Sequence, residues 1–227
     1  MGGVAELFAR ICEYCAVSTY LDPSGRRLDD YPRPSVAVDT AVLTVTAQRS
    51  LAVVLVATDG RWRLPGTFLH EHETLAEAVL RSLRTKAGVE GLSPRQLHVF
   101  DEPDRDDRGW VLSVAHRDAV PAERLTVDEE LARITPLSAL PTLPYGHEDI
   151  LKAAVATLRD DYAYRPDPSA LLAAPFTLRD LQLLHEAVAG APLRRDTFRR
   201  TMEPQLRATG ETLLGSVGKP ARLFTRD

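Results

Sequence analysis

The central part of the chain alternates between apolar runs and short polar breaks. Residues 36–46 and 51–56 are rich in valine, leucine and threonine, a composition that favours buried β-strands. Shorter strands are expected at 62–64, 97–100 and 109–115, the last two on either side of a charged loop. The pattern predicts a β-sheet in the first part of the chain.

Other stretches repeat apolar residues every three to four positions, which is the spacing of one helix face. Two of them begin as capping boxes, Thr74 with Glu77 and Thr177 with Asp180. Gly88 is placed to end the first of these helices. The predicted helices span 1–20, 74–87, 147–161, 177–189 and 193–207.

Two proline-rich segments, 21–35 and 164–175, divide the chain. After the second, two helices and a strand–turn–strand at 210–225 follow in the order of a winged helix. The predicted parts are an N-terminal helical extension at 1–30, an α+β domain at 31–163, a linker at 164–175 and a winged helix-turn-helix domain at 176–227.

Charge is distributed unevenly along the chain. The formal net charge is −4, but residues 190–227 hold eight Lys and Arg against four Asp and Glu, so this tail is +4 and the rest about −8. A basic tail on an acidic protein favours an anionic partner, although a solvated charged helix would have the same composition. The chain has no apolar run of about 20 residues, so no membrane span is expected, and we predict a cytoplasmic protein.

The candidates for contact with DNA lie at the start of the second tail helix and on the expected wing. Arginine at a helix N-terminus opposes the macrodipole, so a pair of them there indicates a role beyond folding. The guanidinium fork suits DNA phosphates and guanine edges. Phe198, Met202 and Leu206, on the other side of this helix, are expected in the core. The predicted DNA-binding residues are Arg194, Arg195, Thr197, Arg199, Arg200, Lys219 and Arg222.

Residues 64–89 resemble the Nudix box, the motif with which Nudix hydrolases hold Mg²⁺ and cleave diphosphates. Glu73, Arg81 and Gly88 match it. The box places three further glutamates on one helix face, where their carboxylates converge on a hard cation. Here those positions are Ser82, Thr85 and Lys86.

Hydroxyl groups are poor Mg²⁺ ligands, and a lysine repels a dication, so we predict no catalytic residue, no metal and no cofactor. The hypothesis is that Lys86, with Arg81, meets a phosphate-bearing ligand directly. The alternative is that Lys86 is an ordinary solvated helix residue.

Several short segments in a specific order resemble the Nudix-related transcriptional regulators of the NrtR family. They cover about residues 30–226, and they are 31–36, the altered box, 107–109, 176–181, 198–200 and 218–224. The resemblance implies a Nudix-like α/β/α sandwich with a mixed sheet, followed by a winged helix. It also implies a homodimeric repressor that binds palindromic operator DNA and senses ADP-ribose or a related nucleotide or sugar phosphate.

The candidate effector-binding residues are of two kinds. Some lie within the altered box, and the others are cationic or aromatic residues that follow it in the chain. For two of them a structural role is open: His147 stands at a helix start, and Arg108 can pair with Asp106 or Asp107. Thr197 replaces an asparagine that is common in the family, so the base preference can differ. The predicted ligand-binding residues are Glu73, Arg81, Lys86, Arg108, Trp110, Tyr145 and His147.

The sequence therefore favours a ligand-responsive transcriptional regulator with an inactive Nudix-like domain. One alternative is an active Nudix hydrolase of nucleoside diphosphate derivatives with an accessory tail. Another is a protein-interaction module in which both domains serve as scaffolds.

Overall fold

The computed structural model describes residues 20–213 and 220–226, and it divides into two units, 1–34 and 35–227. The helix expected at 1–20 lies, apart from Tyr20, outside the described residues, as does Lys219. In the first unit, the expected loop contains one 3-10 turn, Leu28–Asp30. The backbone N–H of Arg27, the residue before this turn, donates to the Asp30 carboxylate at 2.7 Å.

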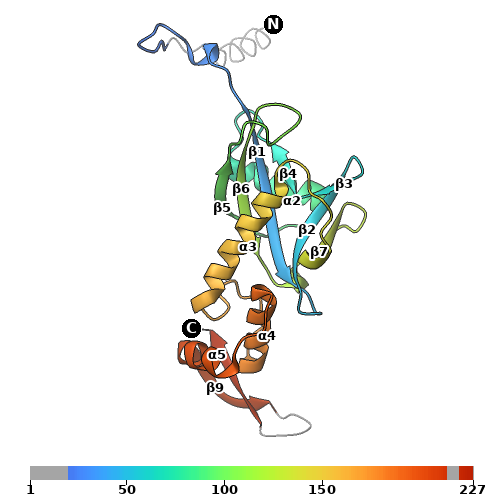
Figure 1. The fold of residues 1–227 in the computed structure, drawn as a ribbon, viewed down its shortest axis with the longest axis vertical. Helices are drawn as coiled ribbons and strands as arrows, with labels where there is room; N and C mark the ends of the chain where they lie inside the picture. Colours follow the sequence, from blue (N-terminus) through green and yellow to red (C-terminus); the bar gives the residue numbers. More distant parts are fainter. Residues whose placement is uncertain (1–19, 214–219, 227) are drawn as a thin grey trace, which may run out of the picture. The chain divides into compact units, whose positions relative to one another are not determined.

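The second unit begins with a mixed sheet, as predicted (Figure 1). Along its main path the order is β3-β2-β1-β6-β5, with β4 paired to β1 and β7 paired to β2. The β1–β6 pairing is parallel and the others are antiparallel. The strands are β1 (Ser35–Val45), β2 (Leu51–Thr58), β3 (Arg61–Arg63), β4 (Gly66–Phe68), β5 (Arg95–Phe100), β6 (Val111–Ala119) and β7 (Ala132–Pro136).

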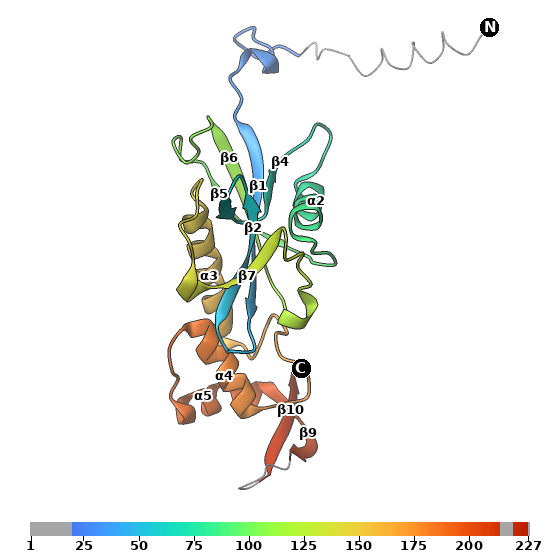
Figure 2. The same ribbon diagram turned by 90° about the vertical axis from the view of Figure 1, so that its right-hand side faces the viewer.

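Two helices cover opposite faces of this sheet (Figure 2). Helix α2 (Leu75–Ala87) has the predicted capping box at its start, and Gly88 ends it with a φ of 66°, in the left-handed region that glycine favours. Helix α3 (His147–Tyr164) packs on the other face. The α/β/α sandwich expected from the sequence is confirmed.

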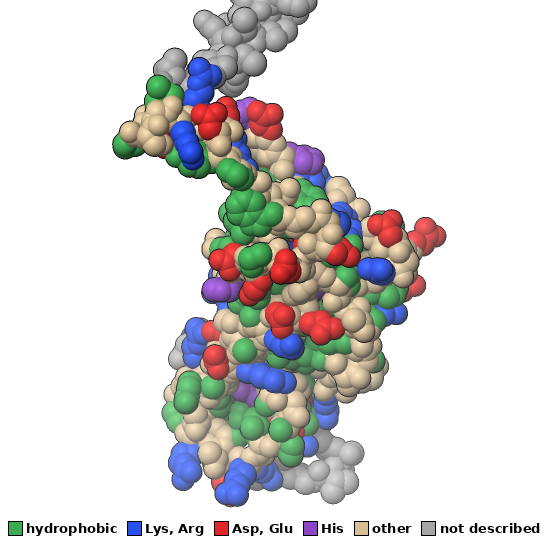
Figure 3. Space-filling model, turned by 45° about the horizontal axis from the view of Figure 1, so that its top comes forward, with side chains coloured by type: hydrophobic (Ala, Val, Ile, Leu, Met, Phe, Trp, Pro, Cys, Tyr) green, Lys and Arg blue, Asp and Glu red, His purple; other side chains and the backbone are tan. Residues whose placement is uncertain are grey.

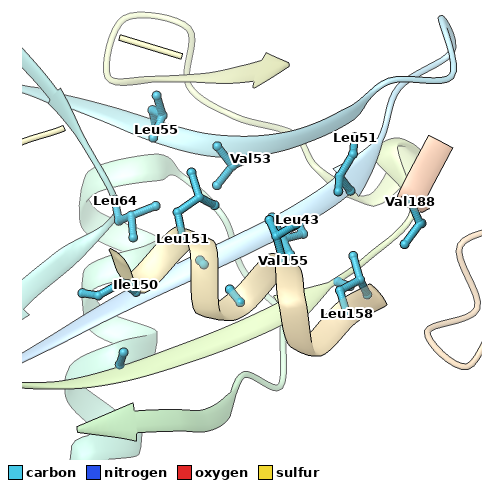
Figure 4. Close-up of a cluster of buried hydrophobic side chains, with 14 of the residues drawn as sticks. Leu43, Leu51, Val53, Leu55, Leu64, Ile150, Leu151, Val155, Leu158 and Val188 are labelled. Atoms are coloured by element: carbon cyan, nitrogen blue, oxygen red, sulfur yellow. The ribbon is translucent and has the colours of Figure 1, made fainter. Parts of the chain in front are cut away.

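Strands β1 and β2 read as continuous apolar runs because both of their faces are buried. Successive side chains point to opposite faces, so Leu43 and Val53 meet α3 while Val42 and Val54 meet α2. Figure 4 shows the α3 side of the core, where Ile150 and other α3 side chains point towards the strands.

The C-terminal part is a winged helix, as predicted. Phe176, Leu181, Phe198, Met202 and Phe224 form its core. Basic side chains gather over this part at the lower end of the view in Figure 3. Its elements are β8 (Phe176–Thr177), α4 (Leu178–Ala189), α5 (Arg195–Met202), β9 (Leu206–Leu213) and β10 (Ala221–Arg226), with the sheet order β8-β10-β9.

The helix predicted at 193–207 is wrong in its extent. It ends at Met202 and is followed by a 3-10 turn, Glu203–Gln205. Pro204 lacks an N–H donor and its ring obstructs a continuing α-helix. Leu206, which was expected on the helix, is the first residue of β9.

The segment predicted as a linker is tightly anchored. Asp167 is fully buried and accepts hydrogen bonds from the Tyr162 hydroxyl at 2.6 Å and from the Arg226 guanidinium at 2.5 Å. It also accepts from the backbone N–H groups of Leu171 and Leu172. This carboxylate therefore ties the end of α3 to β10 of the winged helix.

Helix α4 also extends the core of the Nudix-like domain. Leu184 and Val188 belong to the same apolar cluster as Leu43 and Leu158, and Figure 4 shows Val188 at one end of it. Because of this shared core and the Asp167 network, the two domains meet through a packed joint. Among the described residues, no helix is long and apolar enough to span a membrane.

Candidate functional sites

A cleft opens where β1, the segment from the end of β3 to β4, and the start of α3 meet. Lys86 of α2 and the charged loop between β5 and β6 complete its walls. The lining residues are Ala37, Asp39, Arg63, Leu64, Gly66, Thr67, Phe68, Lys86, Arg105, Asp106, Arg108, Tyr145 and His147.

Asp39 is the buried carboxylate of this cleft, with 6% of the residue exposed. It accepts from the Ser113 hydroxyl at 2.6 Å and lies 3.3 Å from His147 Nε2 and 4.0 Å from the Arg105 guanidinium. Burial by itself raises the pKa of a carboxyl group, but these neighbours, His147 foremost, hold the pKa of Asp39 below its ordinary value. Asp39 is therefore an anion that orders the groups around it.

Gly66 leaves the space that Asp39 occupies. A Cβ built on Gly66 would lie 1.9 Å from the Asp39 carboxylate oxygen, a distance that excludes any side chain there. The glycine of the Pro-Gly pair in the box thus serves this cleft by allowing close approach of the backbone.

His147 uses both ring nitrogens within the protein. Its Nδ1 accepts from the backbone N–H of Leu64 at 3.0 Å, so the neutral ring donates from Nε2 towards Asp39. The residue is 3% exposed. This geometry supports the structural alternative for His147: it holds β3 and orients the buried carboxylate.

Lys86 points into the cleft, and its Nζ donates to the Gly66 carbonyl. Burial, reinforced by the nearby charge of Arg63, lowers the pKa of Lys86, while Asp39 opposes that change. The alternative that Lys86 is a solvated helix residue is therefore wrong.

Arg108 has the structural pairing considered for it, and it also lines the cleft. It pairs with Asp106, not Asp107, with nitrogen–oxygen distances of 2.7 and 2.8 Å. Its guanidinium also lies over the Tyr145 ring, 4.1 Å from the ring centroid, and 5.2 Å from that of Phe68. Asp106 thus holds a flat cation against an aromatic wall.

Three of the predicted ligand-binding residues are not in the cleft lining. Glu73 and Arg81 pair with each other at 2.6 and 2.7 Å, and Arg81 also donates to the Phe68 carbonyl at 3.0 Å. This interaction ties β4 to α2. Trp110 is 50% exposed and lies just before β6.

The cleft also contains residues that the sequence reasoning missed. A charged residue inside an apolar strand was a usable signal for Asp39, because buried carboxylates are rare without partners. For Arg63, Phe68 and Arg105 no such signal existed, since β3, β4 and the loop between β5 and β6 meet at the cleft only in the folded chain.

The side chains at the altered box positions do not fit a metal ion. The Ser82 hydroxyl is buried without a hydrogen-bond partner in the described part of the chain, and the Thr85 hydroxyl donates to the Arg81 carbonyl at 2.8 Å. Lys86 brings a positive charge to the third position. Within residues 20–213 and 220–226, no group of three His, Cys, Asp or Glu is arranged to hold a metal.

Of the predicted DNA-binding residues, Arg194 to Arg200 lie at the start of α5 or on it, Arg222 lies on β10, and Lys219 is outside the described residues. Arg199, Arg200 and Glu203 surround one hollow. Arg194 and Thr197 line a different cavity that faces α3. Phe198 and Met202 are buried in the winged-helix core, as predicted.

Glu203 connects α5 to the wing. It accepts from Arg199 at 2.7 Å and from Arg222 of β10 at 3.0 Å. Both guanidinium groups remain more than half exposed, at 61% and 58%. Arg195 and Arg200 are also exposed, so a row of accessible cations follows the outer side of the helix.

Comparison with known proteins agrees with this two-domain architecture. A NUDIX domain model matches residues 35–154, and a model of the NrtR DNA-binding winged helix domain matches residues 168–225. An ADPR responsive transcriptional repressor of Acinetobacter baylyi is 30% identical over 185 residues, covering 76% of this chain and 74% of the relative. This chain belongs to the NrtR family.

Solved structures and a second relative extend the comparison. Shewanella oneidensis NrtR, crystallised with a 27mer DNA, is 29% identical with a TM-score of 0.69, covering 85% of this chain and 93% of that one. An ADP-ribose pyrophosphatase of Methanocaldococcus jannaschii is 32% identical over 129 residues, covering 54% of this chain and 73% of the relative. This chain is thus similar to an enzyme as well as to a transcriptional repressor.

Proposed function

We propose that this protein is a cytoplasmic, homodimeric transcriptional repressor that binds operator DNA through its winged helix. Its Nudix-like domain binds ADP-ribose, or a similar nucleotide diphosphate, without hydrolysing it. The observation that carries this proposal is Lys86, a half-buried cation inside the cleft at a position where the Nudix box has a metal-binding glutamate.

The charge of the cleft supports a diphosphate ligand. Among its described lining residues, the cations Arg63, Lys86, Arg105 and Arg108 outnumber the carboxylates Asp39 and Asp106. In a partly buried cleft this excess attracts an anion more strongly than it would at an open surface. Lysine and arginine can then neutralise the phosphates that a hydrolase would hold through Mg²⁺.

The aromatic wall supports a nucleotide or sugar attached to that diphosphate. Tyr145, with Arg108 stacked over it, presents a flat surface beside the cations. Arg63 lies 6.0 Å from the centroid of the same ring. Stacking and cation–π contacts of this kind suit an adenine ring and do not require base-specific hydrogen bonds.

The exposed arginines of α5 and β10 suit DNA phosphates and base edges. A two-fold dimer would place two such winged helices on half-sites about 34–36 Å apart, or multiples of that distance. The dimer, the operator and the individual contacts are parts of the proposal.

The packed joint offers a route from effector to operator. Asp167 and the shared core around Val188 join the winged helix to α3, and α3 begins at His147 in the cleft. Effector binding can alter operator affinity only if ADP-ribose binds the DNA-bound and released arrangements with different affinity.

The test is fluorescence anisotropy with DNA from the gene's own upstream region, with and without ADP-ribose, and against scrambled DNA over a salt series. Wild-type protein should bind the upstream fragment specifically and release it when ADP-ribose is added. Lys86→Met should bind the DNA unchanged but lose the ADP-ribose response. The matched control is Lys152→Met, since Lys152 is an exposed α3 residue paired with Asp149.

If the protein binds the upstream fragment specifically but its affinity does not change with ADP-ribose, the assignment as a repressor stands and the assignment of ADP-ribose as effector is wrong. If the protein binds the upstream fragment and the scrambled DNA equally weakly, with strong dependence on salt, the assignment as a repressor is wrong. The similarity to an ADP-ribose pyrophosphatase keeps a hydrolase as the second candidate. That reading requires Mg²⁺-dependent release of AMP from ADP-ribose by the purified protein.

A further inference from the structure

A second cavity lies in the joint between the two domains. Its volume is about 550 Å³, and it lies between α3, α4, the turn after α4 and α5. It shares no lining residue with the effector cleft. Sites for small molecules typically have volumes of about 300–1,000 Å³, so this cavity is large enough for one.

Most of the wall is apolar or aromatic. Tyr162 comes from α3, Val188 from α4, and Phe198 and Met202 from α5. The ring of His185 stands edge-on to those of Tyr162 and Phe198, with centroid distances of 5.1 and 5.0 Å. A flat apolar body matches such a surface.

The charged residues that line this cavity are all positively charged. Arg159 and Arg194 line the cavity, and no Asp or Glu is among its described lining residues. Arg159 Nε donates to the Val188 carbonyl at 3.0 Å, which holds this guanidinium beside the cavity. The wall therefore complements an anionic group.

His185 contributes a buried polar atom without a partner. The residue is 3% exposed, and within the described residues its Nε2 has no hydrogen-bond partner. Burial lowers the pKa of His185 to about 4, so the ring is neutral near pH 7. A neutral imidazole has one acceptor nitrogen, which an O–H or N–H group of a ligand can satisfy.

We propose that the joint cavity binds a small amphipathic anion. Its aromatic or other apolar body packs against Tyr162 and Phe198, its acidic group meets Arg159 and Arg194, and an O–H or N–H group reaches His185. Because α5 forms one wall and α3 another, this ligand contacts both domains at once. The site is separate from ADP-ribose binding and does not depend on it.

The first test is a fluorescence titration of the full-length protein with anilinonaphthalene sulfonate, which combines an aromatic body, an N–H donor and an anion. Wild-type protein should give one saturable site with enhanced emission. Ala189→Trp fills the cavity from an exposed position of α4 and should weaken binding at least about tenfold. Ala156→Trp, which fills the neighbouring groove on α3 instead, is the matched control and should leave binding unchanged.

The second test addresses the charge. Arg159→Gln should weaken binding of the sulfonate probe about three- to tenfold. It should not change binding of phenylnaphthylamine, the uncharged analogue. Arg165→Gln, which removes an exposed arginine that does not line the cavity, controls for net charge.

Equal effects of Ala189→Trp and Ala156→Trp, or no effect of either, would overturn the proposal. So would competition by ADP-ribose that Lys86→Met abolishes, because the probe would then occupy the effector cleft. If Ala189→Trp does not fold by circular dichroism, Ala163→Trp blocks the same cavity from α3 and decides the question.

Discussion

The molecule has two groups of cations, and they differ in how they are held. In the effector cleft, the Arg105 side chain is 4% exposed and Lys86 is half-buried. On the recognition helix, the Arg199 side chain is 61% exposed, and Arg195 and Arg200 are exposed as well. Apart from Arg108, whose side chain is 44% exposed, the cleft cations are partly or almost wholly enclosed by protein, whereas the cations of the recognition helix face solvent.

The difference lies in what each group can recognise. In the cleft, Asp39 and the Tyr145 carbonyl position Arg105, Asp106 positions Arg108, and the Gly66 carbonyl accepts from Lys86 before any ligand arrives. Such a site suits one compact anion of a particular shape. The exposed arginines keep their rotamer freedom and can follow a long polyanion, where binding releases counterions and depends strongly on salt.

The largest effect is expected at the joint that connects the two groups. Asp167→Ala leaves the Tyr162 hydroxyl and the Arg226 guanidinium without their buried partner. The free energy of unfolding should fall by about 3–5 kcal/mol. Urea denaturation measures it, with exposed Asp160→Ala as the control; equal losses in both variants would contradict the role given to Asp167.

The joint should also be sensitive to acid through His185. Burial lowers the pKa of His185 from 6.5 to about 4, so between these values the unfolded chain binds a proton that the folded one does not. Stability is therefore complete above pH 6.5 and is lost as the pH falls towards 4, by about 3 kcal/mol. Denaturation of wild-type and His185→Gln proteins at pH 7 and pH 4.5 measures this, and the variant should lose less stability than the wild type.

The enclosed group is tested by Arg105→Met. Arg105 donates to the Tyr145 carbonyl at 2.8 Å and lies beside Asp39, so its removal disturbs both the charge and the shape of the cleft. ADP-ribose affinity should fall about 30-fold, or about 2 kcal/mol. Isothermal titration calorimetry measures it, and Arg84→Met on the exposed side of α2 should have no effect.

The exposed group is tested by the double substitution Arg199→Gln and Arg200→Gln. Operator affinity should fall about tenfold, and the salt slope should flatten by about 2 because two phosphate contacts are lost. Anisotropy over a salt series measures both quantities. An unchanged slope would mean that these arginines do not face the DNA backbone.

The smallest effect concerns the carboxylate within the exposed group. Glu203 pairs with Arg199 and Arg222 and places a negative charge near the DNA phosphates. Glu203→Gln should strengthen binding to any DNA, specific or scrambled, by about twofold to fivefold. A selective gain for the operator would instead assign Glu203 a part in base recognition.

The sequence predicted the long elements well and the short ones poorly. Strands β1 and β2 and helices α2, α3 and α4 follow from apolar periodicity and capping boxes, which are local signals. The short strands β4, β7 and β8 were not predicted, because two to five residues carry no period of their own. They form where a partner strand offers hydrogen bonds.

The residues of the candidate effector site also divide into those that the sequence predicted and those that it did not. Lys86, Arg108 and Tyr145 were predicted from the altered box and its neighbourhood, and the structure places them in one cleft. Arg63 and Arg105 had no sequence signal, since nothing local distinguishes them from ordinary surface arginines. Glu73 and Arg81 matched the box, but they hold β4 against α2 outside the cleft lining.

By itself, the sequence predicted the two-domain layout, determined the basic character of the tail, and placed Ser82, Thr85 and Lys86 where the resemblance to the Nudix box predicts glutamates. These properties depend on residue type and local spacing. Tertiary structure alone decided that Asp39 orders the cleft, that the proline-rich segment is anchored by Asp167, and that α4 shares a core with α3. Each of these depends on burial and on partners far apart in the chain, which local spacing does not encode.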